Sequence, residues 1–132
     1  MAGIALVAAL VMVVGVAGTV PAAAAPESRA ALIERKAAVL QGLDKITARI
    51  STFEVVVGGT ASFGSLLITV RACREAPPIE PPEAAAFLEI RERIPGEAEE
   101  RLFNGWMFAS SPALSALEHP VYDIWVKSCG GR

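Results

Sequence analysis

Residues that carry chemistry are scarce in this chain. Its 132 residues include one histidine, two cysteines, two tryptophans and one tyrosine. A metal centre needs several histidine, cysteine or carboxylate ligands that converge, and the supply here is poor. The nucleophile motif G-x-S-x-G is absent, and Gly58-Gly59 is not followed by the lysine and helix of a phosphate-binding loop. We therefore expect no metal and no cofactor.

Charge is absent from the first 26 residues, which are mostly Ala, Val, Leu, Ile, Met and Gly. An apolar run that ends in small residues such as Ala22 and Ala24 is the pattern of a secretory signal peptide, so residues 1–25 are interpreted as a leader cleaved near Ala24. The alternative is an uncleaved N-terminal anchor, because the run from Ile4 to Val20 is just long enough to span a bilayer and basic residues follow it rather than precede it. The cleaved leader places the rest of the chain in the periplasm or outside the cell, and this is the expectation we adopt. For an anchor, the basic residues Arg29, Arg35 and Lys36 after the run would favour the opposite orientation. An anchor would also hold the rest of the chain at the inner membrane.

A strong charge of either sign is also missing. The net charge is −2, and every charged residue lies beyond the leader. Nucleic-acid-binding domains carry a basic surface, and anionic lipid attracts polybasic segments. The sequence therefore predicts no nucleic-acid partner, and no membrane contact except through an uncleaved leader.

Cys73 and Cys129 are expected to form a disulfide, because two cysteines in an exported domain of this size usually pair. The loop that they would close is worth about 4 kcal/mol in the chain-entropy model. A redox or metal pair is the alternative, but no C-x-x-C motif is present. Strict alternation along the strands would place Cys73 on the face of Arg71 and Cys129 on the face of Trp125. The bridge is therefore expected to join polar faces, with Trp125 packed near it.

Short segments in which apolar residues alternate with other residues predict β-strands. They cover residues 39–46, 52–57, 66–73, 88–93, 102–108 and 121–129. About six strands joined by short turns predict an all-β fold, either a small antiparallel β-sandwich or a barrel. The chain is divided accordingly into a leader, a linker or frayed helix, a single β domain and a tail, at residues 1–25, 26–37, 38–129 and 130–132.

Two segments interrupt the strand pattern. Pro77-Pro78-Ile79-Glu80-Pro81-Pro82 must be extended and predicts a stiff loop, with a polyproline ligand for a partner as the less favoured interpretation. In the second segment, Ser111 is suited to cap a helix and Pro112 to occupy its first position, whereas His119-Pro120 ends it. One short helix is therefore expected before the last strand.

Aromatic and apolar side chains gather in two late segments, residues 103–108 and 122–125. The simplest interpretation is that they fill the core. Part of them could instead form a docking patch, because Trp, Tyr and Met are favoured at interface centres. If Ile124 and Val126 face the core, Trp125 faces outward, and another group must shield its ring from water. The candidate binding surface consists of Trp106, Met107, Phe108, Ser110, Ser111, His119, Tyr122, Asp123 and Trp125.

Three functions follow from these observations. The favoured one is an exported, non-enzymatic accessory or interaction protein with a protein partner at the inner membrane. The alternative is a module that binds a small ligand or glycan by stacking it on exposed aromatic rings. A serine hydrolase is the least favoured, although its residue types occur together in the segment that holds Ser110, Ser111, His119 and Asp123.

Distinctive segments also resemble a known family. They are GWMFASSP and LEHPVYDIWV, with shorter ones at residues 43–47, 63–66 and 70–74. Together they resemble the domain of unknown function 2155 family, small exported proteins of Gram-negative bacteria, over nearly all of residues 38–129. Genes of this family often lie beside one for an accessory subunit of the respiratory NADH dehydrogenase. The resemblance therefore implies export and service to an inner-membrane respiratory complex, and it supplies no catalytic residue or cofactor.

Overall fold

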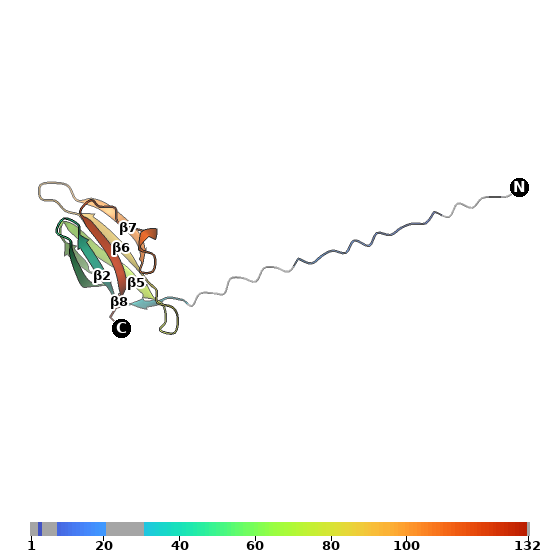
Figure 1. Cartoon of the computed structure of the whole chain (residues 1–132), viewed down its shortest axis with the longest axis horizontal. Helices are drawn as coiled ribbons and strands as arrows, with labels where there is room; N and C mark the ends of the chain where they lie inside the picture. The colour runs from blue at the N-terminus through green and yellow to red at the C-terminus, as the bar shows by residue number, and fades with distance from the viewer. Residues whose placement is uncertain (1–2, 4–7, 21–30, 132) are drawn as a thin grey trace.

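The structure, a computed structural model, describes residues 3, 8–20 and 31–131. The described residues form eight strands and one 3-10 turn, in the order β1 (Ile33–Arg35), β2 (Ala37–Asp44), β3 (Arg49–Val56), β4 (Thr60–Phe63), β5 (Leu66–Glu75), β6 (Ala84–Glu92), β7 (Glu100–Phe108), η1 (Pro112–Leu114) and β8 (Tyr122–Gly130) (Figure 1). Residues 8–20 lie outside these elements and are exposed. In the part of the chain that the structure describes, no helix is long and apolar enough to cross a membrane. The cleavage site predicted near Ala24 lies outside that part.

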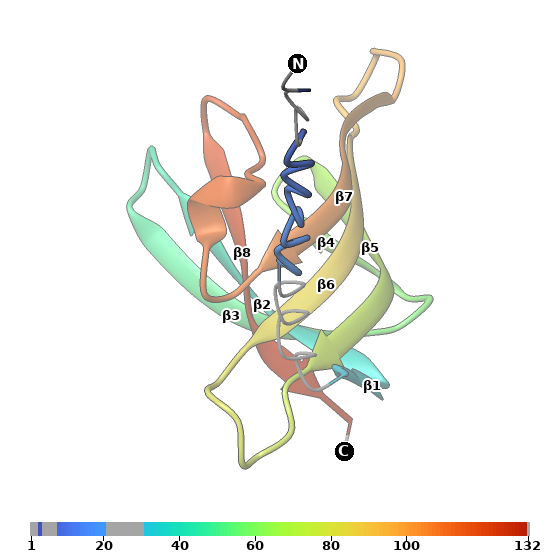
Figure 2. The same ribbon diagram turned by 90° about the vertical axis from the view of Figure 1, so that its right-hand side faces the viewer.

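The strands form two antiparallel sheets that face each other (Figure 2). The larger sheet has the order β1-β5-β6-β7, and β4 pairs with β5 as well; the smaller sheet has the order β3-β2-β8. β1 and β4 occupy different parts of the same edge of β5, at residues 73–75 and 66–69 respectively. The two sheets stay separate in their strand pairing, so the all-β prediction is confirmed and the fold is a sandwich rather than a closed barrel.

Alternation along the strands gives the sheets a shared core. In β2, Ala38 and Leu40 are fully buried, whereas Val39 between them is half-buried on the outer face. The largest fully buried side chains are Leu40, Leu66, Ile68, Val70, Leu88, Ile90 and Cys73. Burying one aliphatic side chain of this kind contributes about 1.5–3 kcal/mol to folding. The two sheets are held together mainly by this contact.

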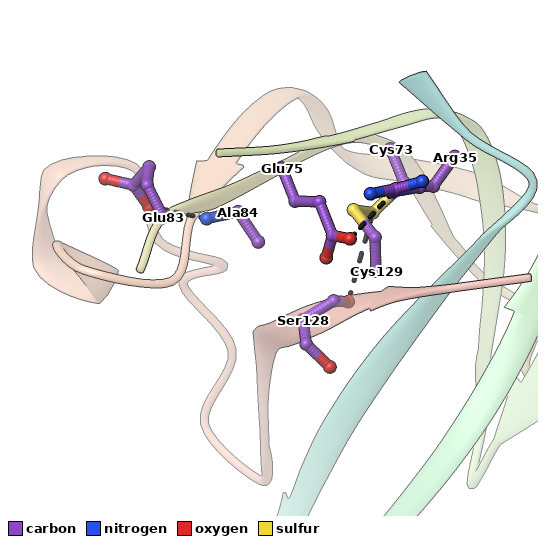
Figure 3. Close-up of a disulfide and its surroundings, with 7 residues drawn as sticks. All are labelled: Arg35, Cys73, Glu75, Glu83, Ala84, Ser128 and Cys129. Carbon is purple, nitrogen blue, oxygen red and sulfur yellow. Dashed lines mark hydrogen bonds and ion pairs between the residues drawn. A yellow bond between two sulfur atoms is a disulfide. The ribbon is translucent and has the colours of Figure 1, made fainter. Parts of the chain in front are cut away.

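A disulfide joins Cys73 of β5 to Cys129 of β8 and so ties one sheet to the other, with 5.9 Å between the two Cα atoms (Figure 3). The predicted bridge is confirmed, but its predicted position is wrong. The two cysteines are 1% and 5% exposed and belong to the core rather than to the polar faces. Trp125 lies on the opposite face of β8, so the bridge does not cover it.

Two β-bulges explain why the cysteines face inward. The pairing of β5 with β6 shifts between Val70 and Ala72, and the pairing of β8 with β2 skips Lys127. One extra residue in a strand moves every later side chain to the other face. Each bulge lies shortly before a cysteine, and together they turn Cys73 and Cys129 toward each other.

Two short strands are missing from the predicted set. β1 lies inside the segment that was predicted as a linker, residues 26–37, and has only three residues. β4 follows the Gly58-Gly59 turn and has four residues. Segments this short give no measurable alternation, so the predicted number of about six strands is too low.

The helix predicted before the last strand is only a 3-10 turn. Ser111 makes no side-chain capping hydrogen bond. In residues 111–120, Leu117 alone is buried, whereas Leu114 is 74% exposed. A short helix in water needs an apolar face that packs against the core, and one buried residue does not provide it.

Four rings contact one another in series at the end of the domain that lies away from the disulfide, with the middle pair edge to face and the outer two pairs stacked. The ring centroids of Phe53 and Phe63 are 5.8 Å apart, those of Phe63 and Tyr122 5.5 Å, and those of Tyr122 and His119 5.1 Å. Gly64 forms the turn between β4 and β5 with a φ of +57°, and it lies directly against Tyr122. A side chain at this glycine would occupy the space that the tyrosine ring fills.

Candidate functional site

The nine residues of the predicted binding surface do not form one surface. Trp106 and Phe108 point outward from β7, whereas Met107 between them is 3% exposed and belongs to the core. Trp125 lies half-buried on the outer face of the smaller sheet. The other five residues lie in the segment 110–123, which connects the two sheets.

Aromatic side chains cluster on the outer face of the larger sheet. Phe87 of β6 is the register partner of Trp106 in β7, and their rings meet edge to face at 5.5 Å. The guanidinium of Arg74 in β5 lies 5.3 Å from the ring centroid of Trp106, which is a cation–π contact. We call Arg74, Phe87, Trp106 and Phe108 the outer aromatic cluster.

Two members of the outer aromatic cluster are absent from the predicted surface. Phe87 lies one residue before the predicted strand that begins at residue 88. An earlier start would have placed it on the outward face of Glu89 and Arg91. The outward position of Arg74 depends on the bulge after Val70, for which the sequence gives no clear signal.

Ion pairs flank the outer aromatic cluster. Arg74 pairs with Glu34 of β1 at 3.3 Å, and Arg71 pairs with Glu89 at 3.1 Å. The hydrogen bond from Arg71 lowers the pKa of Glu89. Such exposed pairs contribute little to stability, because solvent screens them. The Glu34 contact instead helps to hold Arg74 over Trp106.

A groove of about 810 Å³ adjoins the outer aromatic cluster at Phe108. The proline loop forms one wall, and Leu114, which is 74% exposed, lies on the other side. Glu83 is fixed at the groove by the backbone N–H of Ser110 at 3.2 Å, by the Ser110 hydroxyl, and by the N–H of Ala84 at 2.9 Å. The groove is therefore mixed, with an apolar wall and a carboxylate held in place.

His119 is fixed in a hydrogen-bond network. Its Nδ1 accepts from the N–H groups of Val121 at 3.0 Å and Tyr122 at 3.1 Å, which leaves its Nε2 to donate to the carboxylate of Glu92 at 2.6 Å. The hydroxyl of Ser65 donates to the same carboxylate at 2.8 Å. The His119 side chain is 8% exposed. Both ring nitrogens are engaged, so the residue anchors the segment before β8 and has no atom left for a substrate.

The carboxylate of Glu92 gives this network a pH dependence. Hydrogen bonds from Ser65 and His119 lower the pKa of Glu92 below its ordinary value near 4.5, despite partial burial that raises it. A carboxyl group with a lowered pKa stabilises the fold above the pKa of the unfolded chain. That contribution is lost as the pH falls through the folded pKa.

Glu92→Gln is therefore expected to lower the free energy of unfolding by about 1 kcal/mol at pH 7, because a charge-assisted hydrogen bond becomes a neutral one. The difference from the wild type should shrink as the pH falls through the lowered pKa of Glu92 and its carboxyl group becomes protonated. Urea titrations at several pH values measure both quantities. Glu97→Gln, in an exposed turn, is the control and should change stability little at any pH. A difference that stays constant over the whole acid range in which the protein remains folded would contradict the role given to Glu92.

Ser110 and His119 lie at opposite ends of β6. Ser110 is bonded to Glu83, just before the strand, and His119 is bonded to Glu92, at its last position. Nine positions of extended chain span about 30 Å, whereas a nucleophile and its base must be within about 3 Å. A serine hydrolase that uses Ser110 with His119 is therefore ruled out by the geometry.

A metal site is not formed by the described residues. Within residues 3, 8–20 and 31–131, no three His, Cys, Asp or Glu side chains are grouped so that they could hold an ion. Asp123 instead pairs with Lys45 at 3.1 Å. Lys45 also donates to the backbone oxygen of His119 at 2.9 Å, so Asp123 belongs to the network that anchors this segment.

These features define a class of protein: a small domain of two facing β-sheets, joined by one buried disulfide, with aromatic side chains on the outside of its larger sheet. Residues 38–129 match the family described as "Uncharacterized protein conserved in bacteria (DUF2155)", and the chain belongs to this family. An uncharacterised protein of Rickettsia prowazekii (strain Madrid E) is 33% identical over 87 residues, which are 66% of this chain and 56% of that protein. The chain thus spans little more than half the length of this curated relative. No solved structure matches it.

Proposed function

We propose that the chain is an exported, non-enzymatic interaction domain. It binds a protein partner at the inner membrane through the outer aromatic cluster, and the resemblance noted above makes a respiratory complex the first partner to test. The domain acts in the periplasm, where an oxidising environment maintains the disulfide. The predicted leader of residues 1–25 supports this location.

The outer aromatic cluster carries the proposal. An antiparallel sheet with one face on the core normally presents polar residues on the other face. Here Phe87, Trp106 and Phe108 lie on that outer face, half-buried, with no further layer of the described chain above them. Trp and Arg are the residues most often found at the energetic centre of protein interfaces. Trp106 and Arg74 already touch, so the centre of such an interface is preformed.

Trp106→Ala tests the proposal. The wild-type protein, tagged and extracted from membranes with detergent, is expected to copurify with an inner-membrane protein, and a photo-crosslinking residue at position 87 should mark that protein. Trp106→Ala should weaken binding about 30-fold, as expected for the central residue of an interface.

Trp125→Ala, on the outer face of the other sheet, is the matched control and should leave binding within about threefold. Circular dichroism should show both variants folded. Recovery of the wild type only as a lone soluble monomer, or equal loss in both variants, would refute the proposal.

A second candidate function uses the groove beside Phe108. Its volume is that of a small-molecule site, and it combines the apolar side chains of Phe108 and Leu114 with the fixed carboxylate of Glu83. A ligand with a polar group for Glu83 and an apolar or sugar face for Phe108 would fit it. A thermal-shift screen of glycans and small metabolites distinguishes this function, because a ligand for the groove should stabilise the wild type and not Leu114→Asp.

A further inference from the structure

The smaller sheet has an open edge at β3. β3 pairs only with β2 among the described strands, and Figure 2 shows no strand beyond it on that side. Residues 45–52 are all exposed, which covers the whole hairpin turn and the first half of β3. Nothing in the described chain therefore covers this edge.

The backbone groups that point to this edge can be assigned from the pairing. The N–H of Val57 donates to the oxygen of Lys36 at 2.8 Å, in the same register that runs through β2 and β3. Because antiparallel pairs alternate between bonded and non-bonded positions, the N–H and C=O groups of Ile50, Thr52 and Glu54 point away from β2. These groups are free to pair with another strand.

The edge has few of the features that normally prevent strand addition. Such edges are usually protected by proline, by charged side chains, lysine above all, or by a bulge. β3 contains neither proline nor lysine and its register with β2 is continuous; its two charged residues are Arg49, at its first position, and Glu54. Ile50 and Val56 are 59% and 62% exposed on the outer face of this strand. An added strand would cover both.

We propose that a second copy of this chain adds to β3, antiparallel and centred on Phe53. The two three-stranded sheets then become one continuous sheet of six strands. The sequence of β3 is complementary to itself in this register. Ile50 lies opposite the partner's Val56, so two exposed apolar side chains meet, and Thr52 lies opposite the partner's Glu54, whose carboxylate extends across the sheet to Gly130 and leaves the edge itself clear. Both pairs occur twice because of the two-fold symmetry.

Neighbouring registers are less favourable. Centred on Thr52, the pairing puts the apolar Ile50 opposite the partner's Glu54. Centred on Glu54, it puts two carboxylates opposite each other, and like charges in directly opposed positions destabilise a sheet. The register centred on Phe53 also brings two Phe53 rings together at a position where side chains are closest, beside the ring of Phe63.

This inference does not depend on the proposed function. The outer aromatic cluster lies on the other sheet, so each copy in the dimer keeps it free. Loss of dimerisation and loss of partner binding are therefore separate results, from variants on different strands.

Sedimentation of the exported protein, with hydrogen exchange of its backbone amides, tests the dimer. The wild type is expected to sediment at twice the mass of the chain, with the amides of Thr52 and Glu54 protected from exchange. Thr52→Pro removes an N–H that β2 does not use and prevents strand addition, so it should raise the dissociation constant at least about 100-fold while the monomer stays folded. Thr52→Val keeps the N–H and the β-branched shape, and should still dimerise.

Three outcomes would overturn the inference. One is a monomer at every accessible concentration. Another is a dimer that persists in Thr52→Pro, which would place the interface elsewhere. The third is protection of the Thr52 amide only when a different protein is bound, which would make β3 the docking strand of that protein rather than of a second copy.

Discussion

Replacing both cysteines by alanine is expected to lower the free energy of unfolding by about 4 kcal/mol through the lost constraint on the unfolded chain alone, given a separation of 56 residues. Cys73 and Cys129 are also buried, so the smaller side chains leave unfilled space in the core and add to the loss. The net stability of small domains is about 5–15 kcal/mol. A loss of this size leaves a domain at the lower end of that range close to unfolding, so the double variant should be much less stable at 37 °C than the wild type.

Guanidinium titrations of the oxidised wild type, the reduced wild type and the double variant measure this effect. The reduced wild type is the matched control, because it keeps the sulfur atoms and loses only the bond. It should lose about 4 kcal/mol, and the double variant somewhat more. Equal midpoints for the oxidised and reduced proteins would show that the bridge contributes nothing to the fold.

Gly64→Ala is expected to lower the free energy of unfolding by about 3 kcal/mol, from two separate causes. The residue has a φ of +57°, a conformation that disfavours any side chain. The new Cβ would also come within 2.3 Å of Cζ and Oη of Tyr122, so the ring would have to leave its place between Phe63 and His119.

Gly58→Ala separates the two causes. Gly58 has a φ of +88°, but no atom lies within 4 Å of its added Cβ, so only the backbone term remains. We expect it to cost about 1–2 kcal/mol. In a Tyr122→Ala background the cost of Gly64→Ala should fall to that same level. Urea titration of the four variants measures the coupling. A cost for Gly64→Ala that does not depend on Tyr122 would contradict the packing described for this turn.

The long strands could be predicted from the sequence because each contains several alternating positions. In β2, Ala38 and Leu40 are buried on either side of the half-buried Val39, and in β6, Leu88 and Ile90 are buried on either side of Glu89. β1 and β4 could not be predicted in this way. Each is defined by the edge of β5 that it covers rather than by a pattern of its own. Their existence depends on tertiary pairing, which a local reading of residues cannot supply.

The orientation of the two cysteine side chains could not be predicted from local alternation either. Alternation from Leu66 to Val70 is correct, but a bulge reverses it before Cys73, and a second bulge does the same before Cys129. The pairing of the two cysteines was predicted from their number and from the expected export of the chain, and the pairing is confirmed. The inward orientation of both side chains depends on the two β-bulges, and no residue type in the sequence indicates where these bulges lie.

The candidate site was predictable only in outline. Trp106 and Phe108 lie on one outer face, as a docking patch requires, but Met107 between them is in the core. Residues close in sequence, such as Ser110 and His119, are separated because the segment between them runs along the whole length of β6. Phe87 and Arg74 join the cluster from other strands, and only strand pairing brings them there.

The pairing of β1 has a consequence for the orientation of the domain. Ile33 pairs with Glu75, so the chain enters beside the disulfide, at the end that also carries the proline loop and the C-terminus (Figure 2). A leader that stayed in the membrane would tether the domain by this end and hold the hairpin at residues 45–48 away from the lipid. Phe108 and its groove would then stand nearest the bilayer, within reach of a membrane protein that projects only a short way into the periplasm.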